Sequence, residues 1–249
     1  MRISVITAVH NRAPTLRQAI ASVHAQDFDD LEHVIVDGAS TDGSLEISKE
    51  MQGPRTVLIS EPDSGIYDAL SKGFDRATGE VLGVMHSDDL FADDRVLSSV
   101  ARAFEDPSVD AVYGDLQYVK QEDPTQVVRH WRSGEFRPGK LRMGWMPPHP
   151  TLYIRRSVLT RFGSFDRSYR IAADYEAILR YFKSPGFRAV YIPRVLVRMR
   201  VGGESNGRLM KILLKSREDF RAIRHSGVGG FGTLALKNLS KLGQFIRRS

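Results

Sequence analysis

The sequence of 249 residues contains no cysteine, and this absence excludes disulfide bonds, thiolate metal sites and cysteine nucleophiles. It also lacks any apolar run approaching the ~18 residues of a membrane-spanning helix. Its first residues, Met1 to Thr7, turn polar too early for a secretory signal peptide. We therefore expect a protein that works on the cytoplasmic side of the cell.

The composition is that of a globular protein, with 41% hydrophobic and 27% charged residues, which is enough for a sizeable core. The net charge of +6 is unevenly distributed. From Arg208 to Ser249 there are ten Lys or Arg residues and two acidic residues, Glu218 and Asp219. This tail carries +8, and the first 207 residues carry −2. The basic character therefore belongs to the tail.

Strands and helices alternate along the first part of the chain. β-branched, apolar runs predict buried strands over residues 2–9, 32–36, 56–60 and 81–85. Apolar side chains at helical spacing predict helices over residues 15–25 and 66–77, and a third after Ser44. This order indicates βαβ units and an α/β fold with a mostly parallel, Rossmann-like sheet flanked by helices.

The second part of the chain has a less regular pattern. Further strands are expected over residues 110–119, 151–155, 187–192 and 195–201, with helices over 157–162 and 171–182. The polar, arginine-rich segment 121–144 is expected to be a mobile excursion over the site. Two basic amphipathic helices are expected in 208–249. We expect them to lie on an anionic membrane surface, to pack on the domain, or to form a dimer contact.

Acidic side chains follow three consecutive predicted strands, namely Asp37, Asp63 and the pair Asp88-Asp89. In a parallel sheet these strand ends share one edge, where open α/β sheets bind ligands. Two adjacent carboxylates repel each other unless a cation lies nearby, and Mg²⁺ is commonly held by one or two carboxylates together with substrate phosphates. The alternative is that Asp88 or Asp89 only caps the helix that begins near Asp93.

Four motifs, in order, resemble glycosyltransferase family 2, the inverting GT-A enzymes. They are Ser4 to Arg12, Val36 to Ser44, Ser60 to Gly73 and His86-Ser87-Asp88-Asp89. The third is similar to the branch that makes bacterial cell-surface polysaccharides. The resemblance covers about residues 2 to 205. It implies a GT-A catalytic domain over 1–207, with a nucleotide-binding half over about 1–118 and an acceptor half over about 119–207, followed by the helices of 208–249.

The resemblance also implies roles for individual residues. Asp89 would hold Mn²⁺ or Mg²⁺, with His149 as a second candidate ligand, and Asp174 would be the general base. The positions implied for nucleotide binding are Ala8, His10, Asp37, Asp63, Lys72 and Asp88. Ser87 departs from the pattern, since many members have a third acid there, and Ala173 stands where a glutamate usually precedes the base.

The implied reaction moves a single sugar from a nucleoside-diphosphate-sugar, with a UDP-sugar favoured, to a glycan or lipid-linked acceptor. The processive motif Gln-x-x-Arg-Trp is absent from the sequence. The apolar neighbours of Asp174, Ile171 to Ala173, are expected to raise its pKa. Asp174 could instead cap a helix, and His149 could be a structural histidine.

Two other functions are compatible with parts of the sequence. A nucleotidyltransferase would also need a nucleotide site, but its usual glycine-rich phosphate loop is replaced by His10 to Pro14, which contains no glycine. A nucleic-acid-binding module could use the basic tail, but clustered acids would then repel phosphate. We therefore expect no nucleic-acid partner.

Overall fold

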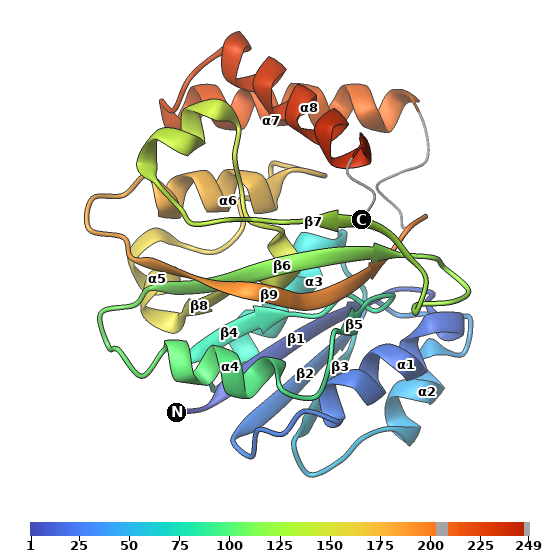
Figure 1. Ribbon diagram of the computed structural model, residues 1–249. Coiled ribbons are helices and arrows are strands. Elements are labelled where there is room, and N and C mark those ends of the chain that lie inside the picture. Colours follow the sequence, from blue (N-terminus) through green and yellow to red (C-terminus); the bar gives the residue numbers. More distant parts are fainter. Residues whose placement is uncertain (203–208, 247–249) are drawn as a thin grey trace.

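The computed structural model describes residues 1–202 and 209–246 of the chain (Figure 1). Its strands are β1 (Ile3–Val9), β2 (Leu31–Asp37), β3 (Thr56–Ser60), β4 (Val81–Val84), β5 (Leu90–Phe91), β6 (Ala111–Val119), β7 (Val127–Trp131), β8 (Tyr153–Arg155) and β9 (Ala189–Arg200). Its helices are α1 (Ala13–His24), α2 (Ser44–Glu50), α3 (Ile66–Arg76), α4 (Val96–Ala103), α5 (Arg156–Phe162), α6 (Ala173–Phe182), α7 (Leu209–Ser226) and α8 (Phe231–Ile246), with short 3₁₀ turns η1 (Pro138–Met143) and η2 (His149–Thr151).

The strands form a nine-stranded sheet in the order β3-β2-β1-β4-β8-β6-β9-β5, with β7 paired to β6. The first four strands of this order are parallel, which confirms the predicted βαβ half. β8 is antiparallel to β4 and to β6, whereas β9 is parallel to β6. The sheet is therefore parallel where the nucleotide motifs lie and mixed beyond them.

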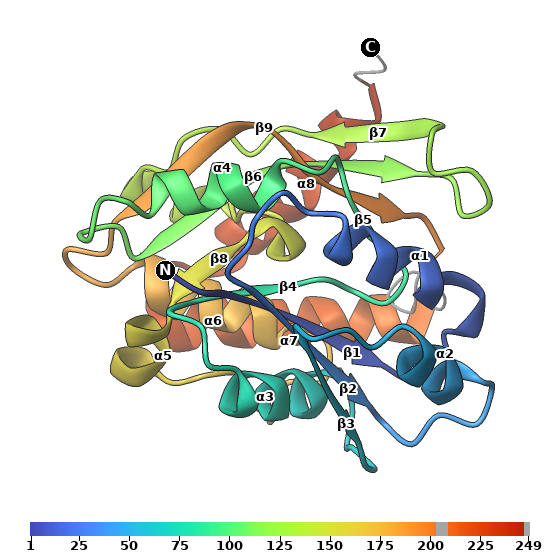
Figure 2. The same ribbon diagram turned by 90° about the horizontal axis from the view of Figure 1, so that it is seen from below.

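Helices cover both faces of the parallel half of the sheet (Figure 2). Side chains of β1 alternate between the two faces, as a strand requires. Ile6 and Ala8 pack in the core shared with α3 and α6, whereas Val5 lies in the core shared with α4. Because neither face meets water, all residues of β1 and β2 are buried, and the polar side chains within them pair across the strands, Ser4 with Glu32 and Thr7 with His33.

Two expectations for the second half of the chain are corrected. The two strands predicted over 187–192 and 195–201 are one long strand, β9, whose pairing with β6 shifts register near Asp115. The excursion predicted over 121–144 contains β7 and η1. It is held to the sheet because the Ser133 N–H donates to Asp115 Oδ1 at 2.8 Å, and the Trp145 indole donates to the Ser133 carbonyl oxygen at 2.8 Å.

The C-terminal helices pack on the preceding part of the chain. Figure 1 shows α7 and α8 beside α6, on the side of the molecule away from α1 and α2. Gly144 follows η1 with φ +75°, and a Cβ there would lie 2.6 Å from Lys237 Cα of α8, so the two backbones are in close contact. Of the three arrangements expected for residues 208–249, the described residues therefore show the second, in which the helices pack on the domain. The predicted boundary at 207/208, with Arg208, lies outside them.

A buried ion pair joins the two C-terminal helices. Lys237 Nζ lies 2.7 Å from Asp219 Oδ1 of α7 and 3.1 Å from the centre of the Tyr175 ring, and both charged side chains are 2% exposed. Buried charges are costly unless they are paired, so this contact ties α8 to α7 and α6. Within the described part of the chain, no helix is long and apolar enough to cross a membrane.

We predict that Lys237→Met lowers the free energy of unfolding by about 3 kcal/mol, because Asp219 then lies buried without its partner charge. Chemical denaturation measures this, with Lys49→Met on the exposed surface of α2 as the control. The double variant Lys237→Met/Asp219→Asn should regain part of the loss. Equal stability of wild type and Lys237→Met would contradict the buried pair.

Candidate active site

The ends of β2 and β3 carry the first group of polar residues. Asp37, the last residue of β2, is fully buried, and its Oδ2 accepts hydrogen bonds from the Ser60 hydroxyl at 2.8 Å and the Ser40 N–H at 3.2 Å. Asp37 Oδ1 is buried with no hydrogen-bond partner. A buried acceptor without a donor is costly, so Oδ1 is available to a donor group on a ligand.

His10 and Asp63 lie on either side of Gly38, directly after Asp37. His10 Nδ1 is 3.1 Å from the Gly38 carbonyl oxygen, and a Cβ on Gly38 would lie 2.1 Å from Asp63 Oδ2. Gly38 is therefore the residue that lets the Asp63 carboxylate approach the end of β2. Ala8 lies beside it in β1, paired with Val36. The structure thus brings Ala8, His10, Asp37 and Asp63 close together at the ends of β1, β2 and β3.

Lys72 of α3 reaches back to the loop that carries Asp63. Its Nζ donates to the Pro62 carbonyl oxygen at 2.8 Å, forms an ion pair with Glu61 at 2.9 Å and lies 3.6 Å from Asp68. The Glu61 and Asp68 carboxylates raise the pKa of Lys72, so it remains a cation at neutral pH. The structure therefore places a positive charge next to the Asp63 loop.

The loop after β4 is held by the end of β9. The Arg200 guanidinium is buried and donates to the Asp88 carbonyl oxygen at 2.6 Å, while the Arg200 N–H donates to Asp89 Oδ1 at 3.0 Å. Asp89 is therefore turned into the protein, and its Oδ2 has no hydrogen-bond partner. Asp88 is half-buried in the same loop. The Arg200 side chain is thus buried beneath the loop and does not lie on a solvated strand face.

Asp89 is the carboxylate of this loop that most needs a cation. Burial, together with the neighbouring Asp88, raises the pKa of Asp89 well above its usual range, although Arg200 opposes the shift. A divalent ion would satisfy its unpartnered oxygen, so the acids of this loop fit a metal. No group of three or more His, Asp or Glu side chains able to hold a metal occurs among the described residues. A metal here would need ligands from its substrate.

Asp174 lies at the start of α6, in contact with α3. The Tyr67 hydroxyl lies 3.1 Å from Asp174 Oδ1 and 2.7 Å from the Ile171 carbonyl oxygen. Burial and the Asp174 charge raise the pKa of the Tyr67 phenol well above its usual range, so the phenol stays protonated and can donate. Because α3 follows the Asp63 loop, this contact brings Asp174 to the edge of the sheet that carries the nucleotide motifs.

His149 lies with Asp174 and with His86 of the β4 loop. The His149 ring centre is 6.0 Å from that of His86 and 5.7 Å from that of Phe165. Burial, opposed by the Asp174 charge and assisted by His86, lowers the pKa of His149 to about 4. His149 is therefore neutral at pH 7. The described ring contacts of His149 are with His86 and Phe165, and His149 lines the same small cavity as Asp174. Asp89, in contrast, is held by Arg200 of β9.

The expectation that apolar neighbours raise the pKa of Asp174 is wrong. Burial does raise it, but the positive charges of Lys215 and of His149 in its protonated form, together with the Tyr175 N–H, outweigh burial and lower the pKa below its usual range. Asp174 is therefore ionised at neutral pH. It lines a small cavity of about 20 Å³ between β4 and α6, whose other walls include His149 and Phe165.

Three residues of this site were missed as site residues. Tyr67 lies inside one of the four motifs, but its partner Asp174 is far away in the sequence, so the contact between them could not be predicted. His86 stands in the acidic motif but carries no acid, and Arg200 is separated from Asp88 by more than a hundred residues. For Arg200 no local signal exists, because its partners are set by the pairing of β9 in the sheet.

Comparison with known proteins gives the family. Residues 4–169 match the model of "Glycosyl transferase family 2". A PGL/p-HBAD biosynthesis glycosyltransferase of Mycobacterium tuberculosis is 31% identical over 222 residues, which cover 85% of this chain and 82% of that protein. An uncharacterized glycosyltransferase of a Nostoc species is 35% identical over 185 residues, which cover 70% of this chain and 57% of that protein.

Solved structures share the fold at lower identity. A mannosyltransferase of Pyrobaculum calidifontis, in complex with GDP-Man and Mn²⁺, superposes with a TM-score of 0.69 at 22% identity, over 98% of this chain and 72% of that one. TarS residues 1–349 of S. aureus, in complex with UDP-GlcNAc, superpose with a TM-score of 0.69 at 17% identity, over 92% of this chain and 66% of that one. The predicted GT-A architecture is confirmed, and the protein belongs to glycosyl transferase family 2.

Proposed function

We propose that this glycosyltransferase moves a single hexosyl or N-acetylhexosaminyl unit from a nucleoside-diphosphate-sugar, with inversion, to a glycan or lipid-linked acceptor of a cell-surface polysaccharide. One observation carries the proposal: an ionised carboxylate, Asp174, is hydrogen-bonded at the edge of the sheet where β2, β3 and β4 present Asp37, Asp63 and the acidic loop. Family membership favours this reaction over a nucleotidyltransferase.

The nucleotide would lie over the ends of β1, β2 and β3. Asp37 Oδ1, buried and unpartnered, would accept a hydrogen bond from the base, and Ala8 and His10 would line the same place. Asp63 and the cationic Lys72 would lie beside the nucleotide, and Asp88 would face the ribose or sugar. The similar structures hold GDP-Man in one case and UDP-GlcNAc in another, and we propose a UDP-sugar donor for this chain.

We propose a Mn²⁺ or Mg²⁺ site at the acidic loop, with Asp89 as the protein ligand through Oδ2. Bound there, the ion would neutralise the diphosphate leaving group as a Lewis acid. The Mn²⁺ in the similar mannosyltransferase structure supports a divalent ion. His149 is neutral, as a ligand must be, but its contacts favour a place beside Asp174 over one beside Asp89.

Asp174 would act as the general base. The acceptor hydroxyl oxygen attacks the anomeric carbon, its proton passes to an Asp174 oxygen, and the bond from that carbon to the diphosphate breaks. The Tyr67 hydroxyl holds Asp174 Oδ1 and so fixes which carboxylate oxygen remains free for the acceptor. A base with a pKa below its usual range is ionised throughout the physiological pH range, at some cost in basicity.

We propose that the C-terminal helices rest on the inner face of an anionic membrane, where a lipid-linked acceptor would be presented. Large apolar side chains project from them into solvent, namely Ile212, Leu213, Phe231, Leu236 and Leu239. The tail that bears them carries +8, and basic amphipathic helices bind anionic lipid surfaces through both features.

We predict that UDP binds in the presence of Mn²⁺, and that Asp89→Asn lowers this affinity at least about tenfold, because the metal loses a charged ligand. Isothermal titration with Mn²⁺ and with EDTA measures it. Asn keeps the oxygen that accepts the Arg200 N–H, and Asp94→Asn on the exposed surface is the matched control. UDP affinity that is the same with EDTA as with Mn²⁺ would contradict the metal site.

We predict that Asp174→Asn lowers kcat by about 10²- to 10⁴-fold and leaves UDP affinity unchanged, because it removes the base without touching the nucleotide site. Protonation of Asp174 should not lower the wild-type kcat/KM between pH 8 and pH 6, because the pKa of Asp174 lies below the usual ~3.9. Transfer assays across pH measure both. A fall in wild-type kcat/KM centred near pH 6.5 would assign the base to another group.

We predict binding to vesicles that contain phosphatidylglycerol and none to pure phosphatidylcholine vesicles, because the tail pairs apolar side chains with positive charge. Leu213→Ser/Leu239→Ser should weaken binding, and added salt should weaken it further. Vesicle sedimentation measures this. Equal sedimentation of wild type and the double variant would refute the role of these side chains.

A further inference from the structure

Glu218 of α7 is a buried carboxylate outside the group of residues described above, with 6% of the residue exposed. Its Oε1 accepts a hydrogen bond from the Arg170 N–H at 2.9 Å. Its Oε2 accepts two more, from the Ile171 N–H at 2.9 Å and the Ala172 N–H at 3.0 Å. One side chain of the C-terminal helix therefore holds three consecutive backbone N–H groups.

These three N–H groups lead directly into α6, whose second residue is Asp174. The first N–H groups of a helix have no partner within the helix, and the Ala172 side chain at the N-cap cannot accept a hydrogen bond. Glu218 accepts the N–H of this N-cap residue, together with those of Arg170 and Ile171, which directly precede the helix. Its negative charge also suits the positive end of the α6 dipole.

Segment 170–174 is thus clamped from two sides. Glu218 of α7 holds the N–H groups of 170–172, and Tyr67 of α3 lies against the Ile171 carbonyl oxygen and the Asp174 carboxylate. If Glu218 were absent, three N–H groups of this backbone would lose their acceptor, and Tyr67 would make the remaining described side-chain hydrogen bonds to segment 170–174. The carboxylate could then rotate or shift away from the acceptor.

We infer that Glu218 is a positioning residue for Asp174, so that helix α7, which follows the family domain in the sequence, helps to build the site of proton transfer. This inference rests on the proposed role of Asp174 as the base. The neighbouring Asp219 has a different task, since it pairs with Lys237 and fastens α8. The two acids of the tail are therefore both buried, one directed to α6 and one to α8.

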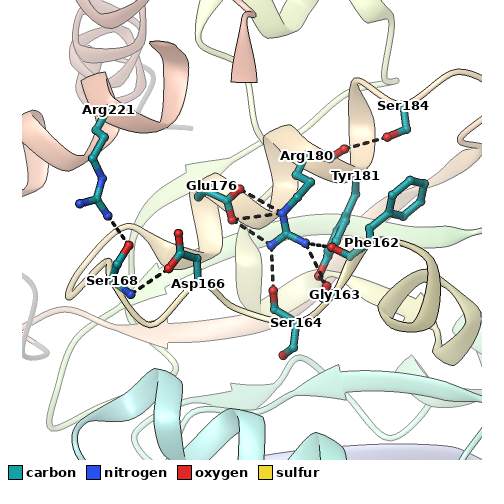
Figure 3. A network of polar contacts seen from close by, with 10 residues as sticks. All are labelled: Phe162, Gly163, Ser164, Asp166, Ser168, Glu176, Arg180, Tyr181, Ser184 and Arg221. Carbon is teal, nitrogen blue, oxygen red and sulfur yellow. Dashed lines mark hydrogen bonds and ion pairs between the residues drawn. The ribbon is translucent and has the colours of Figure 1, made fainter. Parts of the chain in front are cut away.

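A side chain on the same helix provides a matched control. Arg221, one helical turn further along α7, donates to the Ser168 hydroxyl at 2.8 Å (Figure 3). Its guanidinium also stacks on the Tyr169 ring, at 3.6 Å from the ring centre. It contacts the same loop just before segment 170–174, but makes no described hydrogen bond to that segment. Arg221→Ala therefore weakens the contact between α7 and this loop without removing the acceptor of the three N–H groups.

The test measures kcat for sugar transfer and UDP affinity in Glu218→Ala, Glu218→Gln and Arg221→Ala, below the unfolding midpoint of each variant. Glu218→Ala should lower kcat by about 10- to 100-fold, as a misplaced reacting group does, and leave UDP affinity unchanged. Glu218→Gln, which keeps one acceptor oxygen, should recover part of that loss. Arg221→Ala should stay within about twofold of wild type. If Glu218→Ala does not fold, Glu218→Asp, too short to reach all three N–H groups, replaces it.

The same measurements in the Asp174→Asn background separate positioning from general loss of stability. If Glu218 acts through Asp174, Glu218→Ala should cause no further loss of kcat there. A full additional loss, an unchanged kcat in Glu218→Ala alone, or an equal fall in UDP affinity would overturn the inference. If Asp174→Asn itself keeps the wild-type kcat, the assignment of the base fails, whatever the Glu218 variants do.

Discussion

Burial of both faces of the parallel half of the sheet is the constraint on which the rest of the structure depends. Helices α3 and α6 cover one face and α4 packs on the other, so the residues of β1, β2 and β4 are buried along these strands. The polar side chains inside β1 and β2 pair with one another, Ser4 with Glu32 and Thr7 with His33. Side chains that can reach a ligand therefore lie at the strand ends. In a parallel sheet those ends share one edge, which here carries Asp37, Asp63 and the acidic loop after β4.

The acidic loop after β4 and the start of α6 are held by residues that are far from them in the sequence. The buried Arg200 guanidinium holds the loop of Asp88 and Asp89 through the end of β9. Tyr67 and Glu218 hold the start of α6 from α3 and α7. Each of these partners contacts backbone groups, so it fixes the main chain of the segment it holds as well as the side chains that the segment carries.

The C-terminal helices stabilise the fold through their buried side chains and present other side chains to solvent. Their inner side carries the buried Glu218, Asp219 and Lys237, and their outer side carries the exposed apolar residues and most of the described basic ones. A membrane contact on the outer side and support of Asp174 on the inner side are therefore compatible. Helix α7, which carries both exposed apolar residues and Glu218, would then link the presentation of a lipid-linked acceptor to the position of Asp174.

Local patterns in the sequence determined the strands and helices of the parallel half, the family, and the acidic residues at the strand ends, because the alternation of apolar residues and the four motifs are readable within short windows. Tertiary structure alone decided that β9 is one strand, that Arg200 lies beneath the acidic loop, that the pKa of Asp174 is lowered, and that Glu218 holds the start of α6. These features depend on pairs of residues far apart in the chain. Their energies come from burial and from the geometry of hydrogen bonds, which exist only once the chain has folded.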